Sequence, residues 1–110
     1  MTMYELAEAR FTITSNHNDA ELNRELSHAK WCREGNRYVK DDGLNRWTLT
    51  KQEDEYRLRF EQLDLFGKDT GPWDPTIHPE REALLQATLD EIRRCTDGKV
   101  TVHTIRREAR

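Results

Sequence analysis

Residues Trp47–Phe66 read WTLTKQEDEYRLRFEQLDLF, and the alternation within this stretch decides the fold. Apolar residues occupy every second position on either side of a polar break at 52–55. They are Trp47, Leu49, Tyr56, Leu58 and Phe60. Because successive side chains of a strand point to opposite faces, these five share one face. The stretch predicts a β-hairpin with an aromatic and aliphatic inner face and a charged outer face.

The length and composition bound the rest of the chain. At 110 residues, we expect one compact domain over 1–110 with a single core. Hydrophobic and charged residues each make up 35% of the chain, so the core should be small, and dimerisation or a partner is expected to add stability. The sequence has no apolar run of membrane-spanning length and no signal-peptide pattern, and its two cysteines form no disulfide framework. These features predict a cytoplasmic protein with no membrane partner.

Secondary-structure signals on both sides of the hairpin complete the expected fold. The predicted strands and helices are a strand at about Glu8–Thr14, with Tyr4 as an alternative start, a helix from the N-cap Asn18 to Gly35, a strand at Arg37–Lys40, a helix from Pro79 to about Asp97, and a strand at Val100–Ile105. The order is β-α-β-β-β-α-β. It predicts an α+β two-layer sandwich, with a mainly antiparallel sheet of four to five strands and two helices packed on one face.

Two segments fall outside these elements. Residues 67–79 carry all three prolines and two glycines, and they predict a long irregular loop. A loop of this length in a small domain is more often functional than a short connector. Residues 106–110 predict a frayed basic tail.

The charge distribution points to a protein partner with a basic surface. Residues 41–80 hold ten acidic and five basic side chains, a net charge of −5. Trp73 lies between two prolines on an acidic loop and is a candidate anchor for an interface. The predicted partner-binding residues are Glu53, Asp54, Glu55, Asp64, Asp69, Trp73 and Asp74. This pattern favours a non-catalytic protein-binding module, such as a small inhibitor or immunity-type protein that covers a nucleic-acid-binding surface of an enzyme.

The first alternative is a homodimeric regulator that binds nucleic acid. Its contacts would come from Arg57, Arg59, Arg106 and Arg107. In this hypothesis Tyr38 or Trp47 lies near the basic sheet face and stacks on bases. The overall charge of −3 and the glutamate at position 61 disfavour nucleic acid.

The second alternative is a small enzyme with an unfamiliar site. His28 and Cys32 are four residues apart in the predicted first helix, where both would share a face. A zinc site needs three or four ligands, and no paired spacing supplies the others. Cys95 continues an apolar stripe, which indicates a buried thiol. We therefore expect no catalytic residues, no metal and no cofactor.

Overall fold

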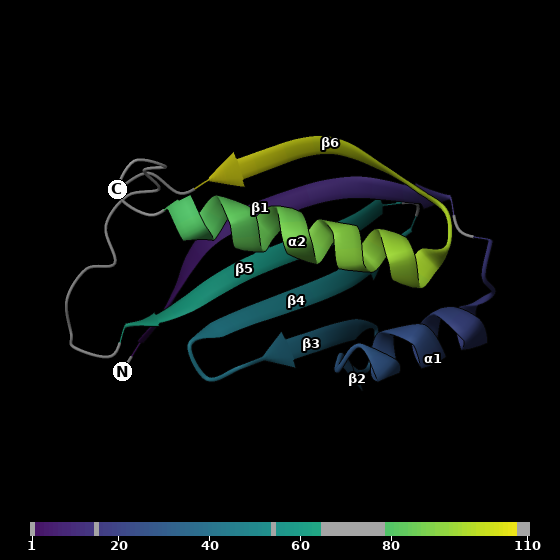
Figure 1. The fold of residues 1–110 in the computed structure, drawn as a ribbon, viewed down its shortest axis with the longest axis horizontal. Helices are drawn as coiled ribbons and strands as arrows, with labels where there is room; N and C mark the ends of the chain where they lie inside the picture. The colour runs from purple at the N-terminus through teal and green to yellow at the C-terminus, as the bar shows by residue number, and fades with distance from the viewer. Residues whose placement is uncertain (1, 15, 54, 65–78, 108–110) are drawn as a thin grey trace.

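A computed structural model describes residues 2–14, 16–53, 55–64 and 79–107, and it confirms the α+β two-layer fold (Figure 1). One antiparallel sheet of six strands has the order β2-β3-β4-β5-β1-β6, one strand more than the sequence predicted. The strands are β1 (Thr2–Thr14), β2 (Cys32–Glu34), β3 (Arg37–Asp41), β4 (Asn45–Gln52), β5 (Glu55–Asp64) and β6 (Lys99–Arg107). The helices are α1 (Asp19–His28) and α2 (Pro79–Thr96).

The β4–β5 hairpin forms as its alternation predicts. Trp47 pairs with Phe60 and Leu49 with Leu58, so the apolar set shares one face. The rings of Trp47 and Phe60 stack with centroids 3.9 Å apart. Gln52 pairs with Glu55, and the turn between them begins with Glu53 in the left-handed region, at φ 47°. The hairpin is therefore closed without the glycine that such turns usually contain.

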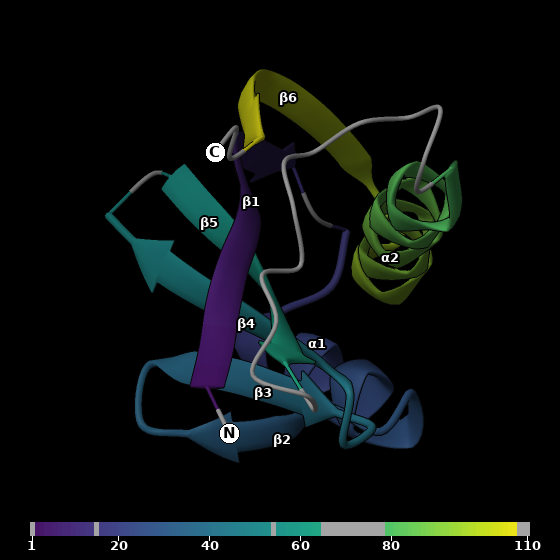
Figure 2. The same ribbon diagram turned by 90° about the vertical axis from the view of Figure 1, so that its left-hand side faces the viewer.

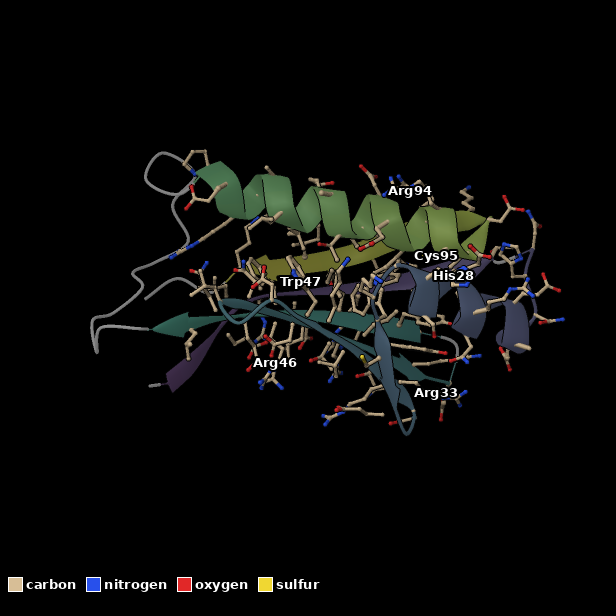
Figure 3. The ribbon with its side chains drawn as sticks, turned by 60° about the horizontal axis from the view of Figure 1, so that its bottom comes forward. His28, Arg33, Arg46, Trp47, Arg94 and Cys95 are labelled. Carbon is tan, nitrogen blue, oxygen red and sulfur yellow. The ribbon has the colours of Figure 1, made fainter. Side chains whose placement is uncertain are left out.

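Both helices pack on one face of the sheet, which we call the covered face (Figures 1 and 2). The α2 stripe of Leu85, Leu89, Ile92 and Cys95 is buried against the strands. Helix α1 contributes Leu22 and Leu26, and Phe11 and Phe60 fill the centre from the sheet side. Among the described residues, no helix lies on the opposite face of the sheet, which we call the open face (Figure 2). Figure 3 shows the contrast in β4, where Trp47 points toward α2 and its neighbour Arg46 points away.

The first helix is shorter than predicted, and Cys32 is not helical. The N-cap is confirmed, since Asn18 Oδ1 accepts a hydrogen bond from the Glu21 N–H at 2.8 Å. The helix ends at His28, and Lys30 takes φ 74°, which turns the chain so that Trp31 is buried. The glycine at position 35 takes φ 65° in the β2–β3 turn. Glycine followed by asparagine favours a hairpin turn as well as a helix end, which is why the sequence misplaced this boundary.

The strands β1 and β6 are also longer than predicted. β1 begins at Thr2 because it pairs with β5 from Thr2 to Phe11, a support that local sequence does not reveal. β6 extends to Arg107, so Arg106 and Arg107 are strand residues and not part of a frayed tail. Of the predicted 67–79 loop, the described residues contain only Pro79, the first residue of α2.

Candidate partner-binding site

A pocket of about 300 Å³ lies where the start of α1 meets the β2–β3 and β4–β5 turns. Its floor is apolar because Leu22 and Leu49 are buried there. Two half-buried tyrosines, Tyr38 of β3 and Tyr56 of β5, form its walls. We call this site the tyrosine pocket. The other residues that line it are Asp19, Arg33, Gly35, Asn36, Lys51 and Glu53.

Contacts with neighbouring residues hold both tyrosines in place. Tyr38 Oη donates a hydrogen bond of 3.0 Å to Asn23 Oδ1 on α1. The Tyr56 ring stacks on Phe11, with centroids 6.0 Å apart and an interplanar angle of 11°. Burial raises the pKa of Tyr56, and the negative charge of Asp19 raises it further, so the Tyr56 hydroxyl stays protonated at neutral pH. The pocket is therefore a preformed hollow with aromatic walls.

Two basic and two acidic side chains surround the pocket, but only the basic ones have a hydrogen-bond or cation–π partner among the described residues. Arg33 Nε donates to a carbonyl oxygen of the β2–β3 turn at 3.1 Å. Lys51 Nζ lies 5.9 Å from the centroid of the Tyr56 ring, a cation–π distance. Asp19 and Glu53 have no ion-pair partner within the part of the chain that the structure describes. The pocket thus combines two carboxylates that form no ion pair with a described residue and an aromatic ring that already lies beside a lysine ammonium group.

Of the predicted acidic side chains that the structure describes, Glu53 and Glu55, one lies at this pocket. Glu53 lines it, whereas Glu55 lies on the open face near Glu8 and Arg10. Glu53 and Glu55 therefore face different parts of the surface. The remaining candidates, Asp54, Asp69, Trp73 and Asp74, lie outside the described residues, as does the side chain of Asp64.

Three of the four predicted arginines meet on the open face. Arg57 and Arg59 of β5 and Arg106 of β6 lie on either side of β1. Arg57 is 3.5 Å from the Glu8 carboxylate, and Arg59 and Arg106 are 3.4 and 3.3 Å from the Glu5 carboxylate. The Glu8 side chain is only 11% exposed. We call this group, together with Arg10, the arginine–glutamate cluster.

The fourth arginine and the aromatic rings are on the covered face. Arg107 Nε and Nη2 donate to the Glu82 carboxylate of α2 at 2.9 and 2.6 Å, which raises the pKa of Arg107. Trp47 is buried under α2, and Tyr38 bonds to α1. The expectation that Tyr38 or Trp47 lies beside the basic sheet face is wrong, because β3 and β4 turn both rings toward the helices.

Sequence reasoning missed the glutamates of the cluster and most of the tyrosine pocket. In β1 the signal was present, since Glu8 and Arg10 alternate with the buried Ala7 and Ala9. The ambiguous start of the chain concealed it. The pocket had no such signal, because its residues come from α1 and from two hairpins, and only the tertiary fold joins them.

The structure separates the residues of the enzyme hypothesis. His28 ends α1, whereas Cys32 begins β2, so the two do not share a helical turn. Cys32 is exposed, and Cys95 is buried with its Sγ 3.7 Å from the Glu25 carbonyl oxygen. Burial raises the pKa of the Cys95 thiol. No group of three or more metal-ligating side chains occurs among the described residues.

Comparison of the chain with protein-family models, with curated proteins and with solved structures finds no match. Within the described residues, no helix has the length and apolar character needed to cross a membrane. The tyrosine pocket and the arginine–glutamate cluster are therefore the features from which a function can be inferred.

Proposed function

We propose that this chain is a non-catalytic protein-binding module that receives a basic side chain of its partner in the tyrosine pocket. The observation that carries this proposal is the pair of carboxylates, Asp19 and Glu53, at a pocket with aromatic walls. Carboxylates supply charge-assisted hydrogen bonds to a guanidinium or ammonium group, and tyrosine faces attract the same cations. The contact of Lys51 with the Tyr56 ring illustrates this attraction within the chain itself.

The finer proposal is that the partner is an enzyme or assembly with a basic, nucleic-acid-binding surface, and that binding inhibits it. An exposed arginine on such a surface would enter the pocket, and the apolar floor of Leu22 and Leu49 would contact its aliphatic portion. The sequence adds the acidic segment at 41–80, which would favour encounter with a basic surface.

A regulator that binds nucleic acid is the second candidate, and the arginine–glutamate cluster favours it. Arginines from β1, β5 and β6 are gathered there on one exposed face. Two glutamates lie among them and already pair with the arginines, which lowers the positive charge available to phosphates. The open face also lacks the stacking rings that the sequence led us to expect there.

The test is affinity capture from host lysate at moderate salt, with protein and nucleic acid both analysed. The wild-type chain is compared with the double variant Asp19→Asn/Glu53→Gln. The control is Glu25→Gln/Asp90→Asn, which also removes two negative charges, but from positions on α1 and α2 outside the pocket. We expect one stoichiometric protein that the pocket variant binds about tenfold more weakly, because charged contacts are lost at the site of docking.

Two outcomes would contradict this proposal. Equal binding by wild-type, pocket and control variants would exclude the pocket as the docking site. Recovery of nucleic acid without a protein partner would favour the second candidate, and substitution of Arg57 and Arg59 should then abolish that recovery.

A further inference from the structure

The two edges of the sheet differ in what they offer another chain. The edge strand β2 has three residues and turns at once into β3. The other edge strand, β6, has nine residues and pairs only with β1 in the part of the chain that the structure describes. The outward half of the N–H and C=O groups of such a strand can pair with an added strand. The tyrosine pocket is lined by residues of α1 and β2–β5, so β6 is a separate surface.

The side chains of β6 leave this edge accessible. Residues 101–104 are all exposed, and no proline interrupts the strand. Val102 is 39% exposed and is one of two large hydrophobic residues exposed among the described residues. It lies between Val100, which is buried, and Ile105, which packs against the core. An added strand would therefore cover an apolar side chain that α2 leaves uncovered.

The charges of β6 select the partner. The strand contains Lys99, Arg106 and Arg107 and no acidic residue; Arg106 pairs with Glu5 and Arg107 with Glu82, whereas Lys99 has no ion pair among the described residues. Antiparallel pairing with a second copy would place Lys99 of one copy near the two arginines of the other, which is unfavourable. The neighbouring cluster leaves this charge unchanged, because its other arginines, Arg10, Arg57 and Arg59, are balanced in number by Glu5, Glu8 and Glu55. The partner strand should thus be acidic.

We propose that the outer edge of β6 adds an extended acidic segment of a partner protein as a further antiparallel or parallel strand of the sheet. Main-chain hydrogen bonds would supply the affinity, and the alternating side chains of the segment would supply the specificity. Its apolar side chains would cover Val102, and its carboxylates would lie near Lys99 and the cluster. This proposal is independent of the tyrosine pocket and holds whether or not that pocket binds a basic surface.

The experiment uses the full chain and an acidic probe peptide of alternating valine and glutamate, matched in length to β6. Amide hydrogen exchange followed by NMR reports which backbone groups the peptide protects. We expect new protection in residues 99–107 and none in β2. A peptide of the same charge with a central proline should give no protection, because proline interrupts strand pairing.

A matched pair of charge reversals tests the role of Lys99. Lys99→Glu should weaken peptide binding about tenfold at low salt, whereas Arg24→Glu, an equal charge change on α1, should leave it unchanged. If Lys99→Glu does not fold, the salt dependence of wild-type binding tests the same point, and affinity should fall as salt rises. Protection elsewhere than β6 would overturn the proposal. Protection of β6 that rises with protein concentration, without peptide, would replace the acidic segment with a second copy.

Discussion

The covered and open faces of the sheet are built from the same strands, but apolar packing holds the first together and ion pairs join the side chains of the second. On the covered face, Leu58 and Phe60 are fully buried against the helices. On the open face, Arg57 and Arg59 of the same strand reach across to glutamates of β1. The covered face is buried beneath the helices except where the tyrosine pocket opens beside the turns, whereas the open face holds its charges in pairs that water can reach. Stability should therefore reside in one face, and recognition in the other face, the edges and the turns.

The sharpest test of this division compares neighbouring residues of β5. Phe60→Ala should lower the free energy of unfolding by about 3–5 kcal/mol, because it leaves a cavity beneath Trp47. Arg59→Ala, on the adjacent position of the open face, should lower it by less than about 1 kcal/mol, since its ion pair is exposed. Urea unfolding of both variants measures the difference. Equal losses would mean that the open face contributes to stability as much as the core.

A polar contact on the covered face provides the next test. Lys40 Nζ of β3 lies 2.9 and 3.0 Å from the two carboxylate oxygens of Glu91 on α2, and 5.9 Å from the centroid of the buried Trp31 ring. Lys40→Met should cost about 1–2 kcal/mol, because the half-buried carboxylate loses its partner. The double variant Lys40→Met/Glu91→Leu should cost less than the sum of the single changes. Additive losses in a double-mutant cycle would show that the two side chains act independently.

The smallest expected effect on stability is at the β3–β4 turn, which lies outside both faces of the sheet. The backbone N–H of Asn45, which donates 2.7 Å to Asp42 Oδ1, holds the pKa of Asp42 below its usual value of 3.8. A lowered folded-state pKa adds stability that is complete above the unfolded pKa and is lost as the pH falls through the folded one. Asp42→Asn should therefore reduce the loss of stability below about pH 4, by less than about 1 kcal/mol because the carboxyl is exposed. Thermal unfolding at pH 7 and at pH 3 measures this. An unchanged difference between the two pH values would contradict it.

The sequence predicted those parts of the fold whose signals are local. The alternation around Trp47, the N-cap at Asn18 and the helix start at Pro79 each gave the correct element. The end of α1 was wrong because its determinant is tertiary, namely the burial of Trp31 after a left-handed residue at position 30. The start of β1 at Thr2 was left open between Tyr4 and Glu8 for the same reason, since pairing with β5 extends the strand.

The candidate sites were predicted less completely than the fold. Arg57 and Arg59 could be assigned to one face from their spacing alone. Their partners Glu5 and Glu8 could not, because strand order decides which strand lies beside β5. The tyrosine pocket depends on how two hairpins and one helix converge, and single-sequence patterns carry no information about that convergence.

The place of β1 within the sheet has a consequence for how the protein is made. β1 is the first strand in the chain, yet its two neighbours are β5 and β6, so that Ala9 pairs with Leu58 and Ile105. During synthesis, both edges of β1 and the apolar Phe11 stay exposed until β5 and β6 have left the ribosome. Contacts of such long sequence separation slow folding and prolong exposure to aggregation. A nascent chain arrested before β6 should therefore be a substrate for chaperones.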